Sequence, residues 1–109
     1  MKIYNIFDSE LDTTLGVVLY YEKDDAFIIE LKDNLTEWNA PLLFAHYVKQ
    51  GIFTVQRDES RIWVRERIIP SGRQNIQDIL DTHRLEKYEE IKFLEISGGK
   101  CSQDSMYLK

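Results

Sequence analysis

The sequence has few residues that build covalent or metal cross-links, since its 109 positions include one cysteine and two histidines. The single Cys101 excludes a disulfide within the chain and any site with several thiolate ligands. No run approaches the roughly 20 apolar residues of a membrane-spanning helix. The early acidic residues Asp8, Glu10 and Asp12 do not fit a signal peptide. We therefore expect a cytoplasmic protein without membrane association.

Motifs of catalysis are also lacking. There is no glycine-rich phosphate loop, no G-x-S-x-G and no H-E-x-x-H. The histidines His46 and His83 fall in separate predicted helices and lack metal-ligand spacing. We expect a protein that is not an enzyme and binds no cofactor or metal. A small enzyme that uses Cys101 or His83 is a weaker alternative, because a thiolate nucleophile needs a positioned, electropositive setting.

What is present is enough apolar material for one core. Hydrophobic residues make up 43% of the chain, and no linker, repeat or low-complexity stretch divides it. We expect a single domain over residues 1–109. The formal net charge is −5, which argues against bulk affinity for nucleic acid. The exception is the segment 51–75, which is net basic and whose basic residues are all arginine, the residue suited to bidentate and stacked contacts.

The pattern of residues predicts both strands and helices. Five stretches rich in β-branched and aromatic residues predict strands, with a hairpin between the second and third: 2–7, 15–22, 26–31, 52–55 and 106–108. Helices are predicted over 42–50, where Asn39 is a possible cap, and over 74–85 and 86–97. The first of these is apolar nearly all round, so we expect it to be buried. The fold class is α+β: a small curved antiparallel sheet of about five strands with helices packed on one side.

Residues 61–69 are ambiguous between strand and helix. A strand would place four residues of the stretch, three arginines and Trp63, on one face. A helix capped by Ser60 would place Arg61 over Arg65, and Trp63 over Arg67. Tryptophan and arginine often carry interface energy, so one interpretation is a contact surface. The other is a core tryptophan with arginines paired to nearby acids. The candidate partner-binding residues are Arg61, Trp63, Arg65, Arg67, Ser71 and Arg73.

The stretch from residue 68 onward resembles the N-terminal subdomain of HipA-type toxin kinases. That family shows an aromatic-rich segment running into L-L-P-E-G, a short helix, and a leucine-bearing helix ending in G-G-x-C. The counterparts here are Ile68-Ile69-Pro70-Ser71-Gly72, the two predicted helices, and Gly98-Gly99-Lys100-Cys101. The early hairpin is similar to the family's first strands, so the resemblance spans residues 15–108. The chain departs from it at Arg67, where the family often has Asn, and at Ser71, where Glu is usual.

The resemblance implies a helix at 61–69 and a function that depends on a partner. The kinase core of the family would follow this subdomain, and its ATP-binding lysine, catalytic Asp loop and metal-binding Asp motif have no counterpart here. The chain is thus similar to the stand-alone component of split HipA-type toxin–antitoxin systems. It would be a non-catalytic module that binds a HipA-like Ser/Thr kinase in trans and regulates or neutralises it, with a helix-turn-helix antitoxin as a possible further partner. The alternative is a transcriptional regulator that binds nucleic acid through the basic segment 57–73.

Overall fold

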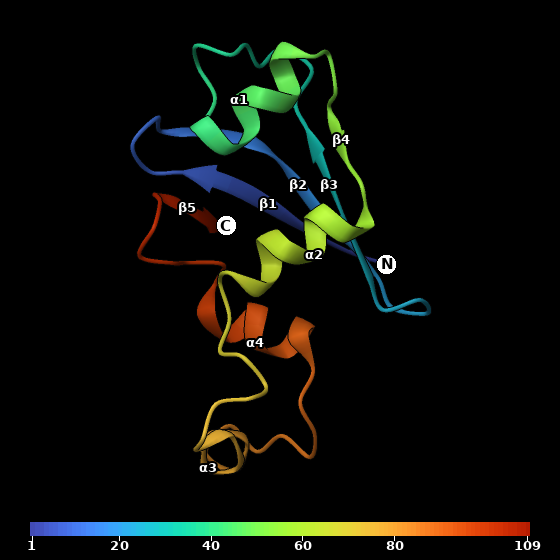
Figure 1. Ribbon diagram of the computed structural model, residues 1–109, viewed down its shortest axis with the longest axis vertical. Helices are drawn as coiled ribbons and strands as arrows, with labels where there is room; N and C mark the ends of the chain where they lie inside the picture. Colours follow the sequence, from blue (N-terminus) through green and yellow to red (C-terminus); the bar gives the residue numbers. More distant parts are fainter.

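A five-stranded antiparallel sheet forms the body of the protein (Figure 1). The computed structural model describes residues 1–109. The strands follow the β-branched and aromatic runs of the sequence: β1 (Lys2–Asp8), β2 (Thr13–Tyr21), β3 (Ala26–Leu31), β4 (Thr54–Val55) and β5 (Met106–Leu108). Their order is β4-β3-β2-β1-β5, so the last strand pairs with the first. The predicted α+β class, the strand count and the hairpin between β2 and β3 are confirmed.

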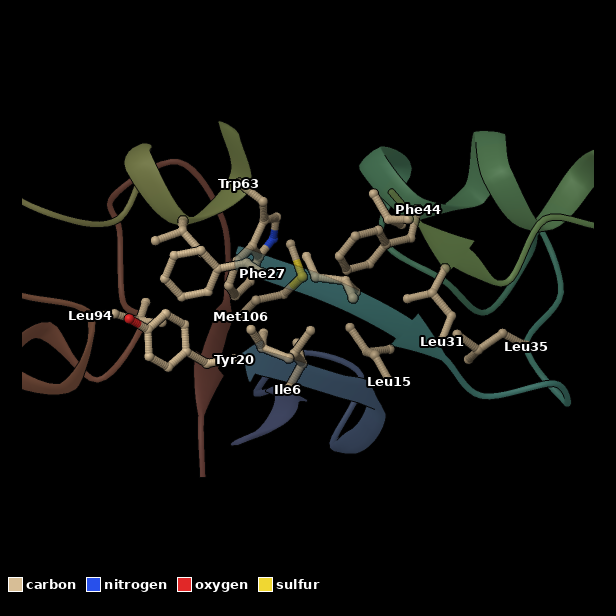
Figure 2. Close-up of a cluster of buried hydrophobic side chains, with 14 of the residues drawn as sticks. Ile6, Leu15, Tyr20, Phe27, Leu31, Leu35, Phe44, Trp63, Leu94 and Met106 are labelled. Atoms are coloured by element: carbon tan, nitrogen blue, oxygen red, sulfur yellow. The ribbon is translucent and has the colours of Figure 1, made fainter. Parts of the chain in front are cut away.

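One face of the sheet carries the core together with three of the four helices. The helices are α1 (Leu42–Lys49), α2 (Arg57–Arg65), α3 (Ile76–Thr82) and α4 (Glu90–Ser97). Side chains of α1, α2 and α4 join sheet residues in one buried cluster, part of which is drawn in Figure 2. Helix α3 lies beyond α4 at the far end of the molecule, away from the sheet (Figure 1). The molecule is therefore elongated, at 43 × 29 × 21 Å.

An irregularity in the β1–β2 pairing sets which residues of β2 enter the core. Ile6 pairs with Gly16 and Phe7 pairs with Thr14, so Leu15 is an extra residue in β2. Such a bulge changes the alternation of side chains, and Leu15 and Val18 are both fully buried in the same cluster. A Cβ at Gly16 would lie 2.1 Å from the carbonyl oxygen of Glu30, so only glycine allows β3 to pass this closely.

The helices differ from their predicted form in three respects. Helix α1 is not buried all round: Leu42 is 90% exposed and only Phe44 and Val48 are buried, because one face of α1 meets the sheet. Asn39 does not cap α1 but accepts a hydrogen bond from the backbone N–H of Thr36 at 2.6 Å. The helix expected over 74–85 is shorter at both ends, as α3. The helix expected over 86–97 begins later, as α4, because turns occupy the residues between the two helices.

The helix implied over 61–69 is found only as far as Arg65, where α2 ends, and residues 66–69 lie outside it. Helix α2 begins at Arg57, earlier than the expected cap at Ser60. Ser60 therefore lies inside the helix, where it is fully buried. Its hydroxyl donates to the carbonyl of Val55 at 2.7 Å and accepts from the backbone N–H of Ile29 at 3.0 Å. One hydroxyl thus joins α2 to β3 and β4, and it holds α2 across the sheet.

Replacement of Ser60 by alanine is expected to lower the free energy of unfolding by about 1–3 kcal/mol, because the buried N–H of Ile29 loses its acceptor. Urea titration followed by circular dichroism measures the change. Ser102→Ala, at an exposed serine, is the matched control and is expected to stay within about 0.5 kcal/mol of the parent. Equal effects of the two variants would contradict the role of Ser60.

Candidate interaction surface

Trp63 and Arg67 lie inside the protein, so the expectation that they form an exposed contact surface is wrong. Trp63 is 2% exposed, and the side chain of Arg67 is completely covered. The helical spacing of Ser60, Trp63 and Arg67 places them on one face, and α2 turns this face toward the sheet. The guanidinium of Arg67 stacks on the indole at 4.0 Å from the ring centroid, the pairing that the helical interpretation predicts.

The charge of Arg67 is balanced by Asp104, from a distant part of the chain. Its Nη1 donates to Oδ1 of Asp104 at 3.0 Å and to the carbonyl of Gly99 at 3.1 Å, and its Nη2 donates to Oδ2 of Asp104 at 2.5 Å. Burial by itself would raise the pKa of Asp104. Hydrogen bonds from Arg67 and from the backbone N–H of Met106 outweigh it and hold the pKa below the usual range. The paired arrangement explains how a guanidinium can be buried here.

The lowered pKa of Asp104 makes the pair a source of pH-dependent stability. A carboxyl group with a depressed folded-state pKa stabilises the fold above its unfolded-state pKa, near 3.9, and loses this contribution as the pH falls through the folded-state value. We expect Asp104→Asn to destabilise the protein near pH 7 and to differ less from the parent below about pH 4. Urea titrations of both proteins across this range measure the difference. A difference that is constant with pH would contradict the assignment.

Arg61 and Arg65 both form ion pairs with the carboxylate of Glu90, at the start of α4. Arg61 bonds to Oε1 of Glu90 and to the carbonyl oxygen of Asp25, and the Nε of Arg65 donates to Oε2 of Glu90 at 2.7 Å. Arg57 also pairs with an acid, Asp24, at 3.5 Å. These contacts join α2 to α4 and to the β2–β3 turn. Within the segment 57–73, Arg57 and Arg65 are thus paired, yet their side chains stay 61% and 63% exposed.

A polar hollow of about 770 Å³ lies beside these ion pairs and includes two of the candidate residues, Arg65 and Ser71. It is lined by the end of β2, by the turn around Pro70 and by the residues that precede α4. On its wall the hydroxyl of Tyr20 donates to Asp25 at 2.9 Å, and burial together with this bond raises the pKa of Tyr20 to about 12. Arg73 is exposed and is not part of the hollow. The structure thus groups Arg61, Arg65 and Ser71, and separates them from the buried pair and from Arg73.

A second hollow, between α1 and α2, was not found from the sequence. It is a mostly apolar groove of about 120 Å³, and we call it the α1–α2 groove; it is lined by Ile29, Leu43, Phe44, Tyr47, Val55, Glu59, Ile62, Trp63 and Glu66. Two of its apolar side chains are unusually open, since Leu43 is 48% and Ile62 is 56% exposed. The signal in the sequence is a single helical stripe with an acid at each end, Glu59-x-x-Ile62-Trp63-x-x-Glu66. This stripe can be recognised as the wall of a groove only when it is known which face of α2 packs against the sheet.

The two histidines and the cysteine considered for catalysis lie in different parts of the structure. His46 lies in α1, and His83 follows α3; both are exposed. The Sγ of Cys101 accepts a hydrogen bond from Arg67 at 3.4 Å, as part of the buried network. No group of three or more His, Cys, Asp or Glu side chains is arranged to hold a metal ion. None of the helices has the length and apolar character that crossing a bilayer requires.

The two hollows differ in character, since the α1–α2 groove is mostly apolar and the other hollow is mostly polar. Comparisons with protein-family models, with curated proteins and with solved structures found no match for this chain.

Proposed function

We propose that this protein is a non-catalytic interaction module that binds a HipA-like Ser/Thr kinase in trans and regulates or neutralises it. The observation that carries the proposal is the position of Arg67. Arg67 directly precedes the segment 68–72, which resembles the first family motif. Its guanidinium donates hydrogen bonds to Gly99 and Cys101, which belong to the second motif, residues 98–101. The two stretches that carry the resemblance are thus parts of one folded unit, which supports treating them as one subdomain.

The paired glycines of the second motif have a structural reason in this fold. Gly98 ends α4 in the left-handed conformation, with φ of 65°. Gly99 has φ of 72°, and a Cβ there would lie 2.7 Å from Cγ of Leu108 in β5. The two glycines let the chain leave α4 and return along the sheet. Their role is to shape the module, which is consistent with an activity expressed through a partner.

A module of this kind regulates a kinase by binding one of its conformations more tightly than the others, because a ligand shifts an equilibrium only by its differential affinity. A helix-turn-helix antitoxin is a further partner that the same resemblance suggests. In such an assembly the module would contact the kinase, while the antitoxin would supply the contacts to DNA. The acidic charge of this chain, −5, fits that division of roles.

Co-expression tests the proposal. The chain, carrying an affinity tag, is produced together with a HipA-like kinase from the same genome, and an acidic protein of similar size replaces it in the control. We expect the kinase to co-purify with the chain, and the growth defect caused by the kinase to change only when the chain is present. Failure to co-purify, together with unchanged toxicity, would overturn the proposal.

A further inference from the structure

We propose that the α1–α2 groove is the docking site for a short basic amphipathic helix of a partner protein. One apolar side chain of that helix would enter the groove, and lysine or arginine on either side of it would meet Glu59 and Glu66. The inference rests on the proposed function in taking the partner to be a protein, and it adds which surface is used and what chemistry it recognises. It moves the expected contact away from Arg67 to this groove, where Trp63 forms part of the base.

The groove has the shape for a single apolar side chain. Leu43 and Tyr47 of α1 form one wall, Ile62 of α2 forms the other, and Trp63 with Phe44 lies beneath them. Its volume of about 120 Å³ compares with apolar cavities on the order of 150 Å³ that hold a benzene ring. A helix laid between two helices presents such a side chain with neighbours three and four residues away along the groove.

The charges at the ends of the groove point to a basic occupant. Glu59 and Glu66 are exposed, neither takes part in an ion pair, and they stand two helical turns apart, about 10 Å along α2, with Ile62 between them. The nearby acids Asp24, Asp25 and Glu90 are paired with arginines of α2. An occupant with cations spaced to match would find both carboxylates free.

A buried donor at the base of the groove is also without a partner. The Nε1 of Trp63 is covered and has no acceptor in the protein. In Figure 2 this nitrogen lies on the edge of the indole that faces Phe44, another residue of the groove. A buried N–H without an acceptor is unusual in folded proteins, and a second such atom is the Nε of Arg67, which does not line the groove.

Two synthetic peptides of about 16 residues provide the probe. Both carry leucine on one face; one has lysine at the flanking positions and its twin has glutamate. Trp38→Phe removes the other indole, which is 87% exposed, so that the fluorescence of Trp63 alone reports binding. We expect the lysine peptide to bind at least tenfold more tightly than its twin, with an affinity that falls as salt rises. Equal binding of the two peptides would overturn the inference.

Variants of the protein locate the binding site. Ile62→Lys, and Glu59→Lys combined with Glu66→Lys, are each expected to weaken binding of the lysine peptide at least tenfold. The matched controls are Ile96→Lys on α4, where the isoleucine is 44% exposed, and Glu10→Lys with Glu86→Lys; both are expected to bind like the parent. All sites are exposed, so circular dichroism and thermal unfolding are expected to be unchanged. Groove variants that bind as well as their controls would overturn the inference.

The same variants, tested with the kinase, separate this inference from the proposed function. If the parent chain and Ile62→Lys capture the kinase equally, the proposed function stands and the groove is not the docking site. If no kinase is captured but the peptide results hold, the groove inference stands and the proposed function fails. Sedimentation of the chain alone tests whether the groove binds a second copy of this protein. A dimer that Ile62→Lys abolishes would assign the groove to that second copy and overturn the inference.

Discussion

Arg67→Ala is expected to lower the free energy of unfolding by about 3–5 kcal/mol. The loss has three parts. The carboxylate of Asp104 is left partly buried without its bidentate partner. The carbonyl of Gly99 loses a donor. The face of the Trp63 indole loses the stacked guanidinium. Lysine would not replace this arginine, because a point charge cannot stack and form a two-point contact at once.

Arg65→Ala is the matched control for this prediction. Arg65 also pairs with a carboxylate, but its side chain is 63% exposed, and exposed ion pairs contribute little. Urea titrations of both variants measure the contrast, and we expect Arg65→Ala to unfold close to the parent. Replacing both members of the ion pair, as Arg67→Met with Asp104→Ala, is expected to be less destabilising than Arg67→Ala alone, since no uncompensated charge remains. Similar effects of Arg67→Ala and Arg65→Ala would contradict the structural role of Arg67.

Trp63→Ala is expected to cost about 3–5 kcal/mol, the range for removing a large aromatic side chain from a core. The indole is 2% exposed and belongs to the central cluster, in contact with the side chains that cover β2 and β3. Its removal leaves a cavity next to Arg67 and takes away the base of the α1–α2 groove. Thermal unfolding and the shape of the near-ultraviolet circular dichroism spectrum measure the loss.

Ile62→Ala provides the comparison, because Ile62 is the neighbouring residue on α2 and is 56% exposed. We expect its effect on stability to stay within about 0.5 kcal/mol. The pair of variants distinguishes a core residue from a docking residue: Trp63→Ala should lose stability, whereas Ile62→Ala should keep stability and lose affinity for the partner. If Trp63→Ala unfolds like the parent and loses only partner binding, the indole is an interface residue and its buried position is contradicted.

These two predictions affect how binding experiments on this protein are interpreted. Replacement of Trp63 or Arg67 would weaken partner binding by destabilising the module, whatever surface the partner uses. Residues suited to mapping the interface are those exposed around the α1–α2 groove, such as Leu43, Ile62 and Glu66. Their substitution changes the surface and leaves the core in place.

Local patterns were sufficient to predict every element of this fold except α2, because they left residues 61–69 open between strand and helix. Runs of β-branched and aromatic residues predicted all five strands and the hairpin, because strand formation depends on residue type and alternation over a few positions. The spacing of residues 61–67 also predicted which side chains lie over one another if the stretch is helical: Trp63 stacks with Arg67, and Arg61 lies near Arg65. That both Arg61 and Arg65 pair with Glu90 is seen only in the structure. The partner-binding role, by contrast, comes from the resemblance to HipA-type subdomains and stays a prediction.

By itself, then, the sequence determined the kinds of elements, their order, and the side-chain pairs within each one. Only the tertiary structure decided which face of α2 is inside. That choice depends on groups far away in the chain: Asp104 neutralises Arg67, and the backbone of Ile29 bonds to Ser60, so the face with the tryptophan turns inward. Ile62 is exposed as a result, since adjacent helical residues point about 100° apart. Contacts across roughly thirty or more positions are not visible in a local pattern, and they made a predicted docking residue part of the core.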